Sequence, residues 1–361
     1  MNHIREKKAV ETKLLPWFRQ HKRILPWREE KTPYRIWISE LLLQQTQVSQ
    51  VVDYFNRFMQ RFPTLKSLAQ APREDVLKLW EGLGYYARAR NLHKTAQILH
   101  NDYKGTFPKT IDGLIKLPGI GPYTAAAIAS IAFGADTAVL DGNVIRVLSR
   151  IFAFNKDVRS ATNRKQLQEI ANQLLVKGEA ADFNEAMMEL GAVICTPQQP
   201  DCSRCPLHTI CKANAQKTVA RYPFKSPAKK TPIITVGAGI VINKQGKYLI
   251  AQRKDDVMLG GLWEFPGGKQ EKGESIKTCI KRELQEELGI TVSVQKKLVT
   301  VHHTYSHFRL VMHTYFCTLV SGTPKTIDCN DFRWCNFDEL RKYPYSKADL
   351  KILDALDALA E

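Results

Sequence analysis

The hydrophobic pattern of this chain changes once along its length, and that change limits the fold to two unlike parts. Residues 1–213 carry apolar side chains at helical spacing, separated by turn signals such as FPT, GTFP and LPGIGP. Residues 232–361 instead carry alternating β-rich runs such as IITVGAGIVI around helical segments at about 275–288 and 347–360. The sequence therefore predicts a multidomain chain, with an all-α domain followed by an α+β domain.

Residues 214–231 separate the two patterns and read as a basic linker. They combine prolines with five Lys or Arg residues, no acidic residue and no apolar periodicity. The whole chain has a formal net charge of +17, and residues 232–361 are nearly balanced. The positive excess over the first part and the linker favours a polyanionic partner, with a solubilising surface as the alternative.

The chain shows no sign of a membrane or secretory segment. No apolar run approaches a membrane span, and the opening residues MNHIREKKAVETK contain no apolar signal segment. We expect a cytoplasmic protein.

Four of the eight cysteines fall in one short loop, over residues 195–211. The spacing is Cys-x6-Cys-x2-Cys-x5-Cys, formed by Cys195, Cys202, Cys205 and Cys211. Thiolates this close in sequence can meet at one metal centre. Zinc and a [4Fe–4S] cluster both remain open, and we favour the cluster because structural zinc sites more often pair two short Cys-x2–4-Cys knuckles.

The stretch LPGIGPYTAAAI, at 117–128, predicts a tight turn running into a small-residue helix. Gly119 and Gly121 would let the backbone approach an anion closely, and the helix N-terminus would direct N–H groups at it. A simple helix–helix turn is the alternative.

Two acids stand in apolar surroundings. Glu40 lies in WISELLLQQTQV and Asp141 in AVLDGNVIRVL. Cleavage of an N-glycosidic bond needs one carboxyl group to protonate the leaving base and another to stabilise positive charge on the sugar. The alternatives are a helix N-cap for Asp141 and a partly exposed helix position for Glu40.

Residues 268–290, GKQEKGESIKTCIKRELQEELGI, fit every fixed position of a Nudix box. On a helix, Glu283, Glu286 and Glu287 share one face and could bind Mg²⁺ beside a diphosphate. A charged, solvated helix face would not explain the accompanying glycines and arginine.

Taken together, these motifs resemble the MutY-type adenine DNA glycosylases of the helix-hairpin-helix superfamily, which also contains endonuclease III. The resemblance covers nearly the whole chain and includes LPWR, TPYRIWISELLLQQTQV, WEGLGYYARARNL, LDGNVIRVLSR, FNEAMMELGAVIC and the cysteine loop. It places the hairpin at about 113–128. It implies a monofunctional, base-flipping enzyme that removes adenine mispaired with 8-oxoguanine or guanine in duplex DNA.

The same resemblance implies roles for individual residues. Glu40 would protonate adenine and then activate water, while Asp141 would stabilise the sugar cation. Tyr123 stands where lyase relatives carry a Schiff-base lysine, which favours base removal without efficient strand cleavage. The other matched positions are Asn143 beside Asp141, the adenine-pocket residues Trp27, Arg28 and Glu185, and the DNA wedges Gln45 and Tyr85.

The resemblance also assigns the C-terminal domain, which would recognise 8-oxoguanine in the template strand. Tyr305, Ser306 and His307, in HHTYSHFRL, resemble the family's Phe-Ser-His loop, with Tyr in place of Phe. The family's Nudix box is usually degenerate but here is intact, so Mg²⁺ binding is expected and diphosphate hydrolysis is kept as a hypothesis.

The expected setting is that of a monomeric bacterial enzyme on the nucleoid. The cysteine loop is expected to press basic residues such as Arg204 and Lys212 against DNA phosphates, with charge transfer as the alternative role. The competing hypotheses are a thymine-mismatch or bifunctional glycosylase of the same superfamily, and a mismatch-binding protein without catalysis.

Overall fold

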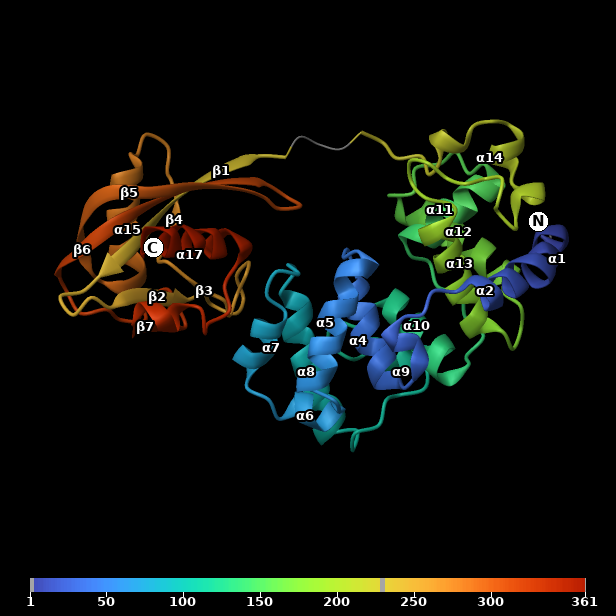
Figure 1. The fold of residues 1–361 in the computed structure, drawn as a ribbon, viewed down its shortest axis with the longest axis horizontal. Helices are drawn as coiled ribbons and strands as arrows, with labels where there is room; N and C mark the ends of the chain where they lie inside the picture. The colour runs from blue at the N-terminus through green and yellow to red at the C-terminus, as the bar shows by residue number, and fades with distance from the viewer. Residues whose placement is uncertain (1–2, 228–230, 361) are drawn as a thin grey trace. The chain divides into compact units, whose positions relative to one another are not determined.

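The computed structural model describes residues 3–227 and 231–360, which form two compact units (Figure 1). Unit 1 comprises residues 3–69 and 94–227, and unit 2 comprises Gln70–His93 and residues 231–360. Of the expected basic linker, residues 228–230 lie outside the described residues. No helix in the described parts is long and apolar enough to cross a membrane.

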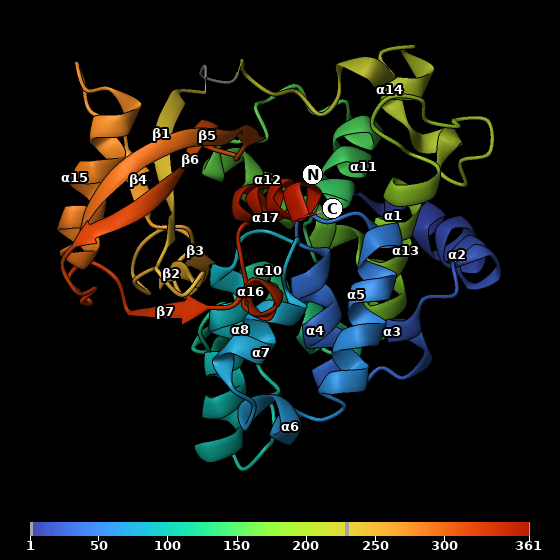
Figure 2. The same cartoon turned by 60° about the vertical axis from the view of Figure 1, so that its left-hand side comes forward.

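Unit 1 is helical, as its periodicity predicts (Figure 2). Its core contains fully buried side chains such as Trp37, Phe55 and Phe183, and burial of each contributes about 2 kcal/mol. Its elements are α1 (Ile4–Ala9), η1 (Val10–Leu14), α2 (Leu15–His21), α3 (Pro26–Glu29), α4 (Pro33–Leu43), α5 (Val48–Arg61), α6 (Leu65–Ala69), most of α8 (Ala87–Asn101), α9 (Ile111–Ile115), α10 (Pro122–Phe133), α11 (Gly142–Phe152), α12 (Ala161–Leu174), α13 (Ala180–Val193), η2 (His208–Ile210), α14 (Lys212–Ala215) and η3 (Val219–Arg221).

Local sequence sets the ends of the helices that matter for function. Helix α4 begins after Thr32, whose hydroxyl accepts a hydrogen bond from the Arg35 backbone N–H. Helix α10 has Pro122 in its first turn and ends at Gly134 in the left-handed conformation. Helix α10 packs against α4 and α13, and α11 packs against α13, so these four helices converge.

Unit 2 is built on a mixed sheet. The strands are β1 (Ile233–Ile242), β2 (Tyr248–Gln252), β3 (Trp263–Glu264), β4 (Gly267–Lys269), β5 (Thr291–Thr304), β6 (Arg309–Ser321) and β7 (Asp331–Cys335). The main path runs β3-β2-β1-β6-β5, with β4 paired to β1 and β7 to β2. Strands β1 and β6 run parallel with Ile240 opposite Phe316, whereas β5 and β6 form a long antiparallel hairpin.

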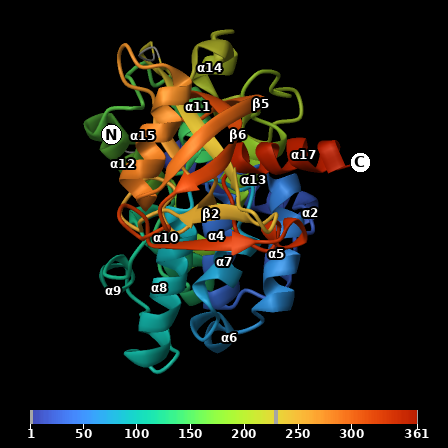
Figure 3. The ribbon, with the colours of Figure 1, turned by 90° about the vertical axis from the view of Figure 1, so that its left-hand side faces the viewer.

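Helices α15 (Ile276–Leu288) and α17 (Lys347–Ala360) cover opposite faces of this sheet (Figure 3). Each helix has its own apolar cluster, one around Leu284 and the other around Ile352. The short helix α16 (Phe337–Leu340) follows β7. The sequence expectation of an α+β domain with helices near 275–288 and 347–360 is therefore confirmed.

A further segment of unit 2 comes from much earlier in the chain. Helix α7 (Arg73–Leu79) and the turn that follows it bond to residues of the C-terminal part. Glu74 accepts a hydrogen bond from Trp263 Nε1 at 3.1 Å, and Glu81 accepts one from the Tyr345 backbone N–H at 2.9 Å. The sequence pattern alone gave no reason to group residues 70–93 with residues 231–360.

Candidate active site

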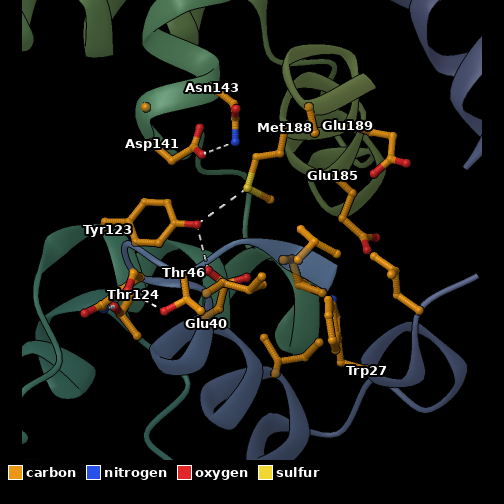
Figure 4. Close-up of a pocket in the computed structure, with 18 of the residues that line it drawn as sticks. Trp27, Glu40, Thr46, Tyr123, Thr124, Asp141, Asn143, Glu185, Met188 and Glu189 are labelled. Carbon is orange, nitrogen blue, oxygen red and sulfur yellow. Dashed lines mark hydrogen bonds between the residues drawn. The ribbon is translucent and has the colours of Figure 1, made fainter. Parts of the chain in front are cut away.

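A cavity of about 640 Å³ in unit 1 gathers all four expected catalytic residues and six of the ten residues expected to bind DNA. That volume is in the range of small-molecule sites. Its lining includes the expected residues Trp27, Arg28, Glu40, Gln45, Gly119, Gly121, Tyr123, Asp141, Asn143 and Glu185, together with Arg23, Leu43, Gln44, Thr46, Thr124, Met188 and Glu189 (Figure 4).

Glu40 sits on α4 with a side chain that is almost completely buried. Its Oε2 accepts a hydrogen bond from the Tyr123 phenol at 2.7 Å. Burial raises the pKa of Glu40 to about 7, helped by the charges of Asp141 and Glu185 and opposed by the Tyr123 bond and Arg28. This carboxyl group can therefore hold a proton near neutral pH and give it up during a reaction.

Asp141 caps the N-terminus of α11. Its Oδ1 accepts from the Val144 backbone N–H at 2.7 Å, and its Oδ2 accepts from Asn143 Nδ2 at 2.8 Å. Burial raises the pKa of Asp141, whereas these hydrogen bonds lower it. The cap expected as an alternative and the position in the pocket thus occur together, and the helix N-terminus favours the carboxylate form.

Glu185 is buried on α13 between two cations that reach it from the α2–α4 region. Its Oε1 accepts from Arg28 Nε at 3.0 Å, and its Oε2 pairs with the Lys31 ammonium. Trp27, on α3, is also buried and meets Phe55 edge-on. The pocket therefore offers an aromatic wall beside a charged wall.

Two turns border the same cavity. Gln45 follows α4 with an exposed side chain and a positive φ of 61°. Gly119 has a φ of 76° in the turn between α9 and α10, where glycine adopts this conformation without strain. Gly121 is the N-cap of α10, so backbone N–H groups at the start of that helix are available to an anion.

Tyr85 and the 305–307 segment lie in unit 2, where they meet. Tyr85 has a positive φ of 49°, and its hydroxyl forms a hydrogen bond with the Ser306 hydroxyl. Ser306 and His307 are exposed at the turn of the β5–β6 hairpin. The Tyr305 ring instead packs inward, 4.5 Å from the His303 ring and 5.0 Å from the Phe308 ring by centroids.

The four clustered cysteines line one small pocket, together with Arg150 and Asn214. Arg150 is buried on α11, and its guanidinium donates to the Cys195 sulfur at 3.2 Å and to the Thr196 carbonyl at 2.7 Å. Four cysteines around a common pocket have the chemistry that a multi-cysteine cofactor needs. Within residues 3–227 and 231–360, no three His, Cys, Asp or Glu side chains are gathered as a site for a single metal ion.

The expected box residues surround Arg282 on α15. Its guanidinium bonds to Glu274 and, at 2.9 Å each, to Glu283 and Glu286. A Cβ on Gly268 would lie 2.3 Å from the Glu283 carboxylate, which explains the glycine. Glu287 turns inward, and burial together with the charge of Glu264 raises its pKa to about 9.

Comparisons with known proteins agree with both units. A family model described as "HhH-GPD superfamily base excision DNA repair protein" matches residues 38–175, and a NUDIX domain model matches residues 237–355. The rat adenine DNA glycosylase is 35% identical over 95% of this chain and 77% of its own length. This chain belongs to the adenine DNA glycosylase family.

Other relatives extend that result. The human adenine DNA glycosylase is 36% identical over 97% of this chain and 74% of its own length. The adenine DNA glycosylase of Buchnera aphidicola is 35% identical over 82% of this chain and 83% of its own length. A solved thermostable thymine-DNA glycosylase, 30% identical with a TM-score of 0.54, covers 59% of this chain and 98% of its own. As an adenine DNA glycosylase, the chain is a DNA N-glycosylase of base excision repair.

Several residues at this cavity were not singled out by the sequence. Arg23, Met188 and Glu189 line the cavity, and Lys31 holds Glu185. Glu189 follows Glu185 by four residues on the same helix, and this spacing was the signal that could have paired them. Arg23 and Lys31 had no signal, because lysines and arginines are usually solvent-exposed.

Proposed function

We propose that this enzyme hydrolyses the N-glycosidic bond of adenine mispaired with 8-oxoguanine or guanine in duplex DNA. The observation that carries the proposal is the buried Glu40 carboxyl, hydrogen-bonded to Tyr123 and sharing one cavity with Asp141. It provides the two carboxyl groups of unlike environment that glycosidic hydrolysis requires.

The proposed chemistry divides the work between these two acids. Protonated Glu40 gives its proton to a ring nitrogen of adenine as the bond from the base to the sugar C1′ breaks. Asp141 stabilises the positive charge that develops on the sugar. Glu40, now a carboxylate, takes a proton from a water molecule whose oxygen bonds to C1′, leaving free adenine and an abasic site.

The geometry of the cavity is compatible with a nucleotide rotated out of the duplex. Trp27 supplies an aromatic surface for the base, and Arg28 and Glu185 supply polar groups for its edge. Gly119 and Gly121 border the cavity where the phosphates of a flipped nucleotide would lie. Gln45 and Tyr85, both exposed on turns, are proposed to enter the space left in the duplex.

Tyr123 supports hydrolysis without strand cleavage. A lyase needs an amine to form an imine with the sugar, and a phenol cannot do so. Burial and the neighbouring carboxylates raise the pKa of Tyr123 well above its ordinary value, so the hydroxyl stays protonated and keeps donating to Glu40.

The cysteine loop is proposed to hold a [4Fe–4S] cluster through Cys195, Cys202, Cys205 and Cys211. Their shared pocket supports this assignment. Such a cluster is capable of one-electron transfer, which hydrolysis does not require. Its proposed role is to fix the loop that carries Arg204 and Lys212 for contact with DNA phosphates.

Recognition of 8-oxoguanine is proposed for the exposed Ser306 and His307, beside Tyr85. A hydroxyl and an imidazole can both bond to the donor that oxidation places at N7 of the purine. Because Tyr305 packs inward, we assign it to supporting the hairpin rather than to stacking on the base. A monomer acting on the bacterial chromosome in the cytoplasm suffices for this function.

A second candidate function, Mg²⁺-dependent hydrolysis of a nucleoside diphosphate linkage, is favoured by the complete box around Arg282. Glu283, Glu286 and Glu287 would hold the cation, and the buried Glu287, whose pKa is raised to about 9, would release its proton on binding. The cation would polarise the phosphate oxygens. Cation binding requires Glu283 and Glu286 to exchange Arg282 for the ion. Release of pyrophosphate from 8-oxo-dGTP with Mg²⁺, absent in a Glu286→Gln variant, is the expected result; equal release from both would reject it.

The main proposal is tested by alkali-revealed strand cleavage under single-turnover conditions. Full-length protein is mixed with duplexes carrying adenine opposite 8-oxoguanine, guanine or thymine, beside a Glu40→Gln variant. We expect cleavage at the adenine position, fastest opposite 8-oxoguanine, and a loss of orders of magnitude in the variant with duplex binding retained. No adenine release by wild-type protein, or equal release by the variant, would reject the proposal.

A further inference from the structure

A buried carboxylate in the wall of the cavity holds two arginines at once. Glu189 is 1% exposed on α13. Its Oε1 accepts from Arg23 Nε at 2.6 Å and from the Arg23 backbone N–H at 3.2 Å. Its Oε2 accepts from Arg23 Nη2 at 2.9 Å and from Arg28 Nη2 at 3.0 Å. All four bonds are charge-assisted, and both carboxylate oxygens are occupied.

Arg28 is fixed by three bonds that leave it little freedom. Its Nε donates to Glu185, its Nη2 donates to Glu189, and its Nη1 donates to the Arg23 carbonyl at 3.1 Å. The guanidinium face also lies over the Phe18 ring, 5.4 Å from its centroid. Removal of Glu189 would free one side of this guanidinium and leave the Arg23 charge without its carboxylate.

Another carboxylate would then compete for Arg28. Glu40 lines the same cavity, and the charge of Arg28 already lowers the pKa of Glu40 against the larger effect of burial. A direct ion pair between the two would keep Glu40 ionised and unable to protonate a base. The other groups acting on Glu40 are the Tyr123 phenol and the carboxylates of Asp141 and Glu185.

We propose that Glu189 is a positioning residue that anchors Arg28 on the Glu185 side of the cavity and so keeps it from pairing with Glu40. This inference rests on the proposed glycosylase function and adds a requirement to it. Glu189 itself does not touch the reacting atoms; it acts through Arg28, and Arg23 completes its charge balance.

The test is the pH dependence of single-turnover adenine release by full-length Glu189→Gln protein. We expect the pH at which the rate falls to be about one unit lower than in wild type, because Arg28 would stabilise ionised Glu40. The rate should then be about fivefold lower at pH 7 and about tenfold lower above pH 8. Glu189→Asp, which keeps the charge, should restore most of the profile. Glu179→Gln, which removes an exposed carboxylate paired with Arg19, is the control and should leave the profile unchanged.

A double variant guards against loss of folding. Arg28→Gln with Glu189→Gln removes both members of their ion pair, so neither of the two is left charged beside a neutral partner, and Glu185 keeps its pairing with Lys31. If Glu189 acts through Arg28, adding Glu189→Gln to Arg28→Gln protein should not move the pH profile further. A wild-type profile in Glu189→Gln protein, or the same shift with Arg28 absent, would overturn the inference, whereas failure of wild-type protein to release adenine would reject the glycosylase proposal itself.

Discussion

The phenol of Tyr123 donates a 2.7 Å hydrogen bond to the carboxyl of Glu40, which joins α10 to α4 at the floor of the cavity. The same hydroxyl lies 3.5 Å from the Met188 sulfur on α13. Three helices distant in sequence therefore fix one titratable group. A carboxyl held in this way can be protonated near neutral pH without moving away from the substrate.

Base release should depend on the protonation of Glu40. Its pKa of about 7 lies above the ordinary 4.5 because the side chain is buried. We expect the single-turnover rate to fall above pH 7, by about tenfold per pH unit, as the proton needed by the leaving base is lost. A rate that stays flat up to pH 9 in wild-type protein would contradict a general-acid role for Glu40.

The Glu40 carboxyl should also lower the stability of the folded protein as the pH rises. Its folded pKa is raised above the unfolded value, so its stabilising contribution is complete below pH 4.5 and is lost as the pH rises through 7. The free energy of unfolding is lower by roughly 3 kcal/mol once this contribution is lost. Between pH 5 and pH 8, the Tm of wild-type protein should fall more than that of Glu40→Gln protein, which has no carboxyl to titrate at this position. Equal falls in Tm would contradict the raised pKa of Glu40.

Charge at Asp141 should matter more for reaction than for folding. In Asp141→Asn the side-chain oxygen can still accept from the Val144 N–H, so the helix cap is kept while the negative charge is lost. We expect a drop of at least about a hundredfold in the rate of base release, with a small change in Tm. Asp136→Asn, at a carboxylate that accepts from the Gly178 N–H outside the cavity, is the control and should retain wild-type rate.

Iron content should separate the clustered cysteines from the scattered ones. Cys202→Ser removes the sulfur of one of the four cysteines that line the common pocket, so we expect loss of most bound iron and of its visible absorbance. Cys279→Ser changes a buried cysteine of unit 2 and should keep full iron content. Equal iron in both proteins would exclude the proposed ligands.

The Ser306 hydroxyl should contribute to the choice of opposing base. Ser306→Ala removes its hydrogen bonds while leaving Tyr85 in place, so adenine opposite 8-oxoguanine should lose about tenfold of its advantage over adenine opposite guanine. Ser321→Ala, at the exposed far end of β6, serves as the matched control. If Ser306→Ala protein keeps the wild-type preference for adenine opposite 8-oxoguanine, Ser306 does not contribute to recognition of that base.

Motif spacing predicted the two fold types and singled out Glu40, Asp141, Gly119 and Gly121, because these depend on local sequence. Trp27, Arg28 and Glu185 were expected only from the family resemblance. Helical periodicity placed Glu40 in a helix, and the Gly-rich turn placed Gly119 and Gly121 before α10. The convergence of α4, α10, α11 and α13 depends on packing between segments distant in sequence, so the place of Met188 in the cavity could not be located in advance, and Glu189 had only its spacing from Glu185 as a signal.

The sequence was also a poor guide to side-chain direction. Tyr305 belongs to the expected recognition segment, yet its ring joins the apolar cluster that includes Ile352. Burial also opposes ionisation of its hydroxyl and raises the pKa of Tyr305 to about 12. Alternation in a strand near a hairpin turn does not decide which side chain packs inward, since the turn changes the direction of the chain.

The membership of residues 70–93 in unit 2 bears on how this protein is made. Glu74, Glu81 and Tyr86 find their bonding partners 189, 264 and 259 residues later in the chain. While the ribosome is still translating the second half, the distant partners of these three bonds have not yet been made. Unit 2 can therefore close only after synthesis is nearly complete, and early termination would leave a segment in the first third of the chain exposed to proteases and chaperones.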